Sequence, residues 1–156
     1  MSSIYNTGYE VIISGIFAVL IAQTIKFVSH LIVKRSIDFR ILSTTGGMPS
    51  SHTAAVVSLS TSVGLVSGWD SVAFAISAGY ALIVMQDAAG LRRASGKMAV
   101  CLNKMMDDFY KHEMQAAGGK LKEMLGHTPF EVFAGAIFGC LFSYFIHFYF
   151  IPHFFN

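Results

Sequence analysis

Long apolar runs alternate with short polar connections along this chain of 156 residues. The first run covers residues 9–33, which is long enough to cross a hydrocarbon core of about 30 Å with some tilt. Its second half carries Gln23, Lys26 and His30 near one helical face. A lysine inside a span normally faces protein or a water-filled cavity, so Lys26 is a functional candidate. The alternative is a lysine that snorkels to the interface.

Two shorter apolar segments, residues 51–66 and 71–86, predict a helical hairpin that turns at Gly68-Trp69-Asp70. Each arm would be about 24 Å long, which is shorter than the hydrocarbon core. Such arms need protein neighbours or a locally thinned bilayer, and Trp69 is typical of an interfacial anchor. Residues 87–93 close the hairpin with one carboxylate and two guanidinium groups, from Asp87, Arg92 and Arg93.

A polar segment follows, residues 94–124, in which apolar side chains recur at helical spacing. They are Met98, Leu102, Met105 and Phe109. This pattern predicts an amphipathic helix that lies against the membrane or the core and breaks at Gly118-Gly119.

The last apolar run, residues 129–151, predicts a further span. Thr128 and Glu131 form a capping box at its start, with a proline at the first helical position. Gly135-x-x-x-Gly139 forms a face that lets another helix approach closely. That face suits either a packing seam inside the monomer or a homodimer.

The composition makes this an integral membrane protein. Hydrophobic residues make up 54% of the chain and charged residues 13%, against roughly 25% charged in soluble domains. We predict an all-α membrane bundle of about four spans plus the amphipathic helix, as a single domain over residues 1–156. A net charge of +2 without basic runs argues against nucleic acid as a partner. Cys101 and Cys140 show no metal or redox spacing.

The distribution of Lys and Arg predicts the topology. Of the eleven, three lie in residues 34–40 and seven in residues 92–122, and both segments fall on one side of the predicted spans. The positive-inside rule places that side in the cytoplasm, with both termini outside.

One stretch combines flexible, rigid and polar residues at the start of an apolar helix: Gly46-Gly47-Met48-Pro49-Ser50-Ser51-His52-Thr53. The glycine pair permits tight turns, and either serine could cap the helix. The N–H groups of the first turn would then face an anion, and His52 could give or take a proton there.

A second histidine, His127, precedes the last span, and the polar residues expected at the same face include many cations. They are Lys26, Arg35 or Arg40, Arg92 and Arg93. Two histidines among cations suit phosphoryl transfer, in which one attacks phosphorus and the other protonates the leaving oxygen. A metal site is the rival use of histidines and carboxylates. The excess of cations favours an anion, so we expect no metal and no cofactor.

These motifs resemble those of a known family. Pro49-Ser50-Ser51-His52 resembles the Pro-Ser-Gly-His motif of the type 2 phosphatidic acid phosphatases, a superfamily shared with vanadium haloperoxidases. His127-x-x-x-Glu131 resembles that family's His-x-x-x-Asp motif. Residues 46–52, 87–93 and 125–132 together closely resemble its small divergent bacterial and plastid branch, over about residues 20–140.

The resemblance implies a role for each matched residue. His127 would be the nucleophile that forms a phosphohistidine, oriented by Glu131, and His52 would be the general acid. Ser50 and Ser51 would bind phosphate.

The cationic part of the motif departs from the family pattern. Lys26 with Arg35 would stand for its Lys…Arg motif, but they are nine residues apart rather than seven, which leaves Arg40 open. Arg92 or Arg93 would stand for the Ser-Arg before the nucleophile, but they lie about 35 residues upstream of it. Lys120 or Lys122 could fill this second role instead, with Asp87 as possible support. Glu also replaces the family's Asp, and the capping box explains this Glu without catalysis.

The expected function is a metal-independent membrane phosphatase that hydrolyses lipid phosphates at the cytoplasmic face of a bacterial inner membrane or a plastid membrane. Phosphatidylglycerol phosphate and phosphatidic acid are the expected substrates, because both are presented at that face. The alternative is a non-catalytic lipid-phosphate-binding scaffold, which would tolerate loss of His127. Haloperoxidase activity with bound vanadate is disfavoured because no peroxide route is evident. Fewer spans than the family's usual six leave room for a second subunit to complete the site.

Overall fold

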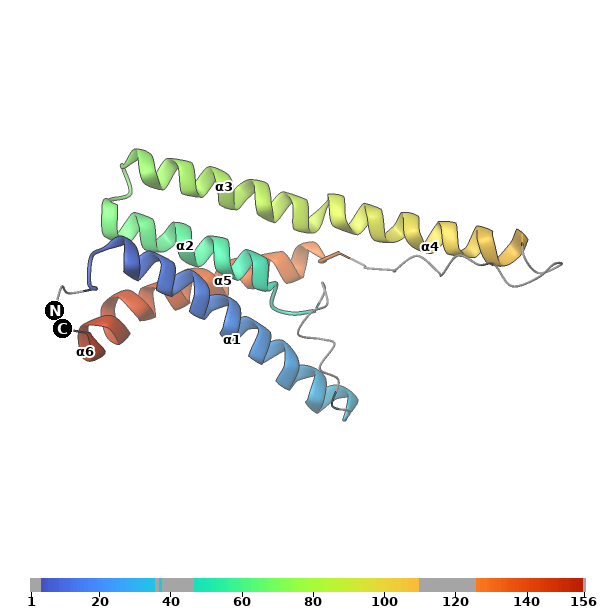
Figure 1. The fold of residues 1–156 in the computed structure, drawn as a ribbon, viewed down its shortest axis with the longest axis horizontal. Coiled ribbons are helices and arrows are strands. Elements are labelled where there is room, and N and C mark those ends of the chain that lie inside the picture. The colour runs from blue at the N-terminus through green and yellow to red at the C-terminus, as the bar shows by residue number, and fades with distance from the viewer. Residues whose placement is uncertain (1–3, 36, 38–46, 110–125, 156) are drawn as a thin grey trace.

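A computed structural model describes residues 4–35, 37, 47–109 and 126–155, and the regular elements in this part of the chain are all helices (Figure 1). The helices are α1 (Gly8–Lys34), α2 (Ser51–Ser67), α3 (Val72–Ala89), α4 (Leu91–Phe109), α5 (Pro129–Phe145), the π-helical η2 (Ile146–Phe150) and α6 (Ile151–Phe154). The predicted membrane helical bundle is therefore confirmed, with helix boundaries close to those of the apolar runs.

Helix α2 lies at the centre of the bundle and packs against α1, α3 and α5. Its buried residues are small and mostly polar: Ser51, Thr53, Ala54, Ser58, Ser60, Thr61, Ser62 and Gly64. Small side chains allow helix backbones to approach closely, and their hydroxyls can bond across the interface. Ser14 Oγ and Ser58 Oγ lie 2.7 Å apart between α1 and α2, and Ser60 Oγ and Ser77 Oγ lie 3.2 Å apart between α2 and α3.

The closest helix approach joins α2 to α5 along two glycines. A Cβ on Gly135 would lie 2.6 Å from the backbone oxygen of Ser50, and one on Gly139 would lie 2.5 Å from that of Ala54. The glycine face of α5 is therefore a packing seam within the chain, and a homodimer through this face would have to displace α2.

Three described helical segments are long and apolar enough to cross a membrane: Gly8–Val33, Val72–Met106 and Pro129–Phe154. With 17 residues, α2 is about 26 Å long, as expected for a short arm enclosed by neighbours. It runs alongside the longer helices between the two ends of the bundle, and both chain termini lie at one end (Figure 1). The bundle thus combines three long apolar segments with one short central helix.

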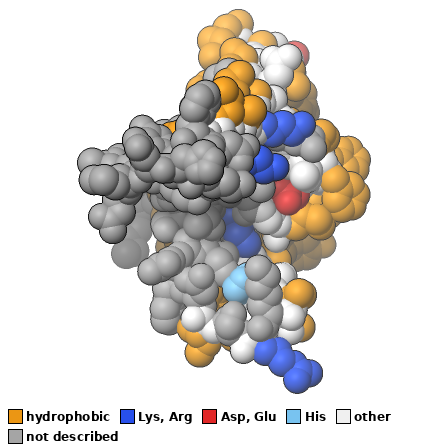
Figure 2. Space-filling view, turned by 90° about the vertical axis from the view of Figure 1, so that its right-hand side faces the viewer, with side chains coloured by type: hydrophobic (Ala, Val, Ile, Leu, Met, Phe, Trp, Pro, Cys, Tyr) orange, Lys and Arg blue, Asp and Glu red, His pale blue; other side chains and the backbone are white. Residues whose placement is uncertain are grey.

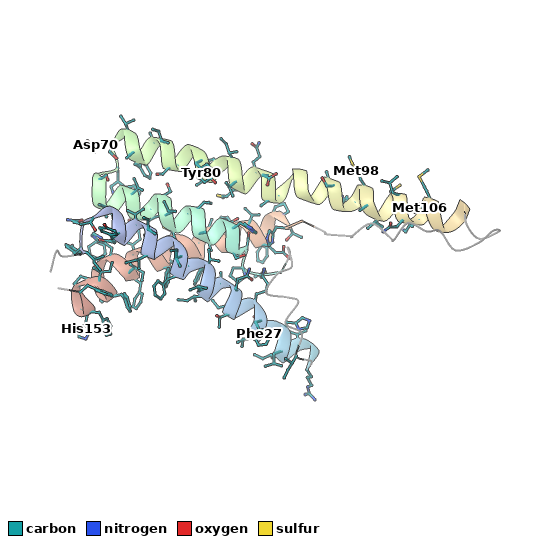
Figure 3. The ribbon with its side chains drawn as sticks, in the orientation of Figure 1. Phe27, Asp70, Tyr80, Met98, Met106 and His153 are labelled. Carbon is teal, nitrogen blue, oxygen red and sulfur yellow. The ribbon has the colours of Figure 1, made fainter. Side chains whose placement is uncertain are left out.

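The hairpin does not close at residues 87–93 as predicted. Instead α4 continues nearly along the direction of α3 and extends beyond the bundle (Figures 1 and 3). The helical hydrogen bonds pass through the junction, because Gly90 N–H donates to Gln86 O and Ala94 N–H donates to Gly90 O, each at 2.9 Å. The amphipathic helix is present as α4, but it leaves the core rather than lying along it. The predicted break at Gly118-Gly119 lies outside the described residues.

The end of the bundle that holds the termini contains a buried ionisable pair. Glu10 Oε1 and His147 Nδ1 lie 2.6 Å apart, and these residues are 0% and 5% exposed. Asn6 N–H donates to Glu10 Oε2 at 2.8 Å, and the Tyr5 ring stacks on His147 at 5.1 Å. Glu10 and His147 are therefore each other's buried partner, a pairing that sequence analysis did not predict.

Candidate functional site

The candidate site lies at the other end of the bundle, where α2 and α5 begin. Gly47, in the connection before α2, adopts φ +85°, a left-handed conformation that favours glycine. A Cβ at this position would lie 3.3 Å from Cγ of Lys26 on α1. The glycine-rich connection therefore packs directly on the lysine stem, a contact the sequence did not predict. Gly46 lies outside the described residues.

Ser50 joins the start of α2 to the start of α5. Its hydroxyl accepts a hydrogen bond from Thr53 N–H at 3.4 Å, and it is the N-cap of α2. Its own N–H donates to the Glu131 backbone oxygen at 3.1 Å. Ser50 and Ser51 are both buried, at 0% and 3% exposure. The predicted helix cap is confirmed, and it fixes the Pro-Ser-Ser-His motif against the first turn of α5.

One carboxylate oxygen serves both the helix cap and the histidine. Glu131 Oε2 lies 3.1 Å from His127 Nδ1, and it accepts the Thr128 N–H at 3.0 Å. The Thr128 hydroxyl completes the capping box by accepting Glu131 N–H at 3.3 Å. Capping and histidine orientation, which looked like competing explanations of Glu131, are therefore compatible. A carboxylate at Nδ1 favours the tautomer with its proton on Nδ1 and its lone pair on Nε2.

The two predicted histidines lie together. Their ring centroids, on His52 and His127, are 6.5 Å apart with the rings edge to face. Reacting atoms are typically 3–3.5 Å apart, about half of this centroid distance. A phosphoryl group between the two rings could therefore contact both imidazoles. His127 is buried at 1% exposure, whereas His52 is exposed in the first turn of α2. The burial suits a fixed group, and the exposure suits a group that exchanges protons with water.

Among the described side chains, Lys26 is the cation that lies at this site. It is only 5% exposed, and its ammonium group attracts the Glu131 carboxylate electrostatically. A buried charge requires such compensation, because removal from water is costly. Lys26 therefore belongs to the bundle interior and does not snorkel. Seen from this end, several Lys or Arg side chains, a carboxylate and a histidine face the viewer, with hydrophobic side chains along the top and right of the view (Figure 2).

Among the other predicted cations, the structure describes only the side chain of Arg35, and it does not lie at the site. Arg35 is exposed at the C-cap of α1, with φ +50°, and lies nine residues or about 13 Å along the helix axis from Lys26. Asp87 is half-buried in the last turn of α3. Arg92 and Arg93 are in the first turn of α4, but their side chains lie outside the description. Outside it also are Arg40, Lys120 and Lys122.

A cavity of about 270 Å³ lies beside His52. It is lined by residues of α1, α2 and α3: Val19, Gln23, Ser51, His52, Ala55, Val56, Tyr80 and Val84. Gln23 Oε1 is buried and has no hydrogen-bond partner among the described residues. Sequence analysis noted Gln23 as an interruption of the first span but did not predict Tyr80, which reads as one more lipid-facing aromatic residue.

Together these features define a helical membrane protein with paired histidines at two helix N-termini, above a buried lysine. The chain belongs to the divergent PAP2 family, whose family model matches residues 7–142. It is 42% identical over 150 residues to "Uncharacterized membrane protein YuiD" of Bacillus subtilis (strain 168), across 90% of this chain and 95% of that protein. No solved structure matches the chain. The predicted family resemblance is therefore confirmed.

Proposed function

We propose that this protein is a membrane phosphatase that hydrolyses lipid phosphomonoesters through a phosphohistidine, without a metal ion. The observation that carries this proposal is the contact between His127 Nδ1 and Glu131 Oε2 at 3.1 Å, with the His52 ring 6.5 Å from that of His127. A histidine held by a carboxylate and facing a second histidine is suited to nucleophilic attack with general acid catalysis.

In the proposed reaction, Nε2 of His127 attacks phosphorus and the bond from phosphorus to the lipid oxygen breaks. His52 donates a proton to the departing alcohol. Neutral His52 then takes a proton from water, the water attacks the phosphohistidine, and inorganic phosphate leaves as His127 is regenerated. The Glu131 carboxylate offsets the positive charge that the His127 ring gains in the intermediate.

The phosphoryl oxygens are assigned to Lys26, to the Ser51 hydroxyl and to the first-turn N–H groups of α2. A helix N-terminus and a buried ammonium both favour negative charge. Ser50 supports this arrangement as the cap of α2 rather than through its own hydroxyl, which accepts the Thr53 N–H.

The substrate is proposed to be a phospholipid head group at the cytoplasmic face, such as phosphatidylglycerol phosphate or phosphatidic acid. The support is the positive-inside rule, since ten of the eleven Lys and Arg residues lie in residues 34–40 and 92–122, which the sequence predicts to share one side of the membrane with His52 and His127. In a bacterium this would be the inner membrane, and in a plant cell a plastid membrane.

The test is phosphate release by purified protein in detergent from a panel of lipid phosphates, with and without EDTA. Wild type is compared with His127→Ala and with His153→Ala, which removes an exposed histidine from the opposite end of the bundle. We expect release that survives EDTA, disappears in His127→Ala and persists in His153→Ala.

The other outcomes separate the alternatives. Lipid-phosphate binding without release in folded wild type, unchanged in His127→Ala, would identify a binding scaffold instead. Release abolished by EDTA would mean that the histidines serve a metal ion.

A further inference from the structure

The cavity beside His52 continues from the candidate site into the apolar part of the bundle. On each of its three helices it is lined by one residue near the site and another four positions deeper: Gln23 and Val19, Ser51 and Ala55, Val84 and Tyr80. Four helical residues rise by about 6 Å. On α1 and α2 the lining therefore changes from polar at the site to aliphatic one turn below it, whereas α3 lines the cavity with Val84 and Tyr80.

This cavity opens toward the side of the bundle. Helices α1 and α3 both pack against α2, which forms the floor between them. Tyr80, labelled on α3 in Figure 3, is 62% exposed although it lines the cavity. Since α1 and α3 are both candidate spans, the surroundings at this depth are the hydrocarbon core. We call this feature the α1–α3 groove.

The size of the α1–α3 groove limits its occupant. Its 270 Å³ falls just below the roughly 300–1,000 Å³ of sites that enclose drug-sized ligands. A whole two-chain lipid does not fit, but the linker beside the phosphate and the first carbons of one chain do. Gln23 at the upper end is half-buried, its buried Oε1 lacks a hydrogen-bond partner among the described residues, and its amide can bond to the polar linker of such a lipid.

We propose that the α1–α3 groove holds the linker and the first part of one hydrocarbon chain of a lipid phosphate, which enters from the bilayer between α1 and α3. The proposal rests on the proposed function, because the phosphate of that lipid would lie at His52 and His127. Ala55, Val84 and Tyr80 then determine which chains are accepted, and Gln23 positions the linker.

The first test fills the groove with Ala55→Leu and compares two substrates, a long-chain phosphatidic acid and chainless glycerol phosphate. We expect kcat/KM for the long-chain substrate to fall at least tenfold, while that for glycerol phosphate changes less than twofold. Ala73→Leu, at an exposed position on α3, is the matched control and should leave both unchanged. An equal loss for both substrates, or no loss for either, would overturn the proposal. If Ala55→Leu does not fold, Val84→Phe fills the same groove from α3.

The second test does not depend on turnover. His127→Ala protein in vesicles of phosphatidylcholine is exposed to a phosphatidic acid that carries a photoreactive group near its ester carbonyl. We expect cross-links at residues 55–56 and 80–84 that excess phosphatidic acid suppresses and that Ala55→Leu reduces severalfold. Cross-links spread over the outer surface of α3 and unaffected by Ala55→Leu would refute groove binding. Cross-links in the groove without phosphate release by wild type would retain the lipid site and refute the phosphatase.

Discussion

The close contact between α2 and α5 makes Gly139→Ala a sharp test of the fold. The added Cβ would lie 2.5 Å from Ala54 O and 3.0 Å from Ser58 N. Both atoms belong to the α2 backbone, so no side-chain rotation can relieve the overlap and the helices must separate. Overpacking of this kind costs about 1–3 kcal/mol, and we take the upper end because only backbone can move.

Part of that cost is returned, because alanine favours a helix over glycine by about 1 kcal/mol. The net loss is therefore about 2 kcal/mol, or up to roughly 30-fold in the ratio of folded to unfolded protein. For a chain of this length, that corresponds to a fall in Tm of about 4–8 °C. The matched control is Gly79→Ala in α3, where a Cβ meets nothing within 4 Å. This variant gains only the higher helix propensity of alanine, without overpacking, and should raise Tm by about 2–4 °C.

Both variants and wild type are to be heated in the same detergent while intrinsic fluorescence and far-UV circular dichroism are recorded. If Gly139→Ala were as stable as Gly79→Ala, the α2–α5 seam described above would be wrong. Gly135→Ala extends the test to the site, because its Cβ would lie 2.6 Å from Ser50 O. It should reduce phosphatase activity by a larger factor than Gly139→Ala at a temperature where both remain folded.

Three further predictions concern charged groups. Glu131→Gln should lower kcat about 10²–10⁴-fold, because the carboxylate that fixes the His127 tautomer is lost. Tm should hardly change, because glutamine also completes a capping box. A large fall in Tm with kcat retained would contradict this. Lys26→Met should raise the inhibition constant for inorganic phosphate about 10–100-fold, as expected for loss of one charged hydrogen bond, and unchanged inhibition would place the anion elsewhere. His147→Ala should cost about 3–5 kcal/mol by leaving the buried Glu10 carboxylate uncompensated. Adding Glu10→Gln should restore part of that loss in denaturant unfolding, and additive losses would argue against the pair.

The helices could be predicted because each apolar run is continuous and is bounded by polar, glycine or proline residues, although only the first and last runs have the full length of a span. The last run began at Pro129 as predicted, since the capping box and the proline both mark that residue. The continuity of α3 and α4 could not be predicted, because the charged residues near Gly90 look like a chain reversal in sequence. Only the hydrogen bonds through that junction show that the helix resumes in nearly the same direction.

The site was predicted where short motifs specify it and missed where distant segments meet. His52, His127 and Glu131 came together because two helix starts, each with its own cap, lie at one end of the bundle. The packing of Gly47 on Lys26 depends on how a loop folds over another helix, which no local pattern encodes. The pairing of Glu10 with His147 could have been found by counting helix turns, since both helices reach the same end of the bundle from opposite directions.

The enclosed, serine-rich α2 also bears on how the chain is assembled during synthesis. A helix of 17 residues whose inner face carries so many hydroxyl groups gains little from contact with lipid alone. Ser58 and Ser60 on this face bond to α1 and α3, and α5, which emerges from the ribosome last, packs closely along α2 through Gly135 and Gly139. Membrane integration of α2 should therefore be completed only after α5 arrives. A nascent chain halted before Pro129 should leave α2 accessible to water-soluble labels that the finished protein excludes.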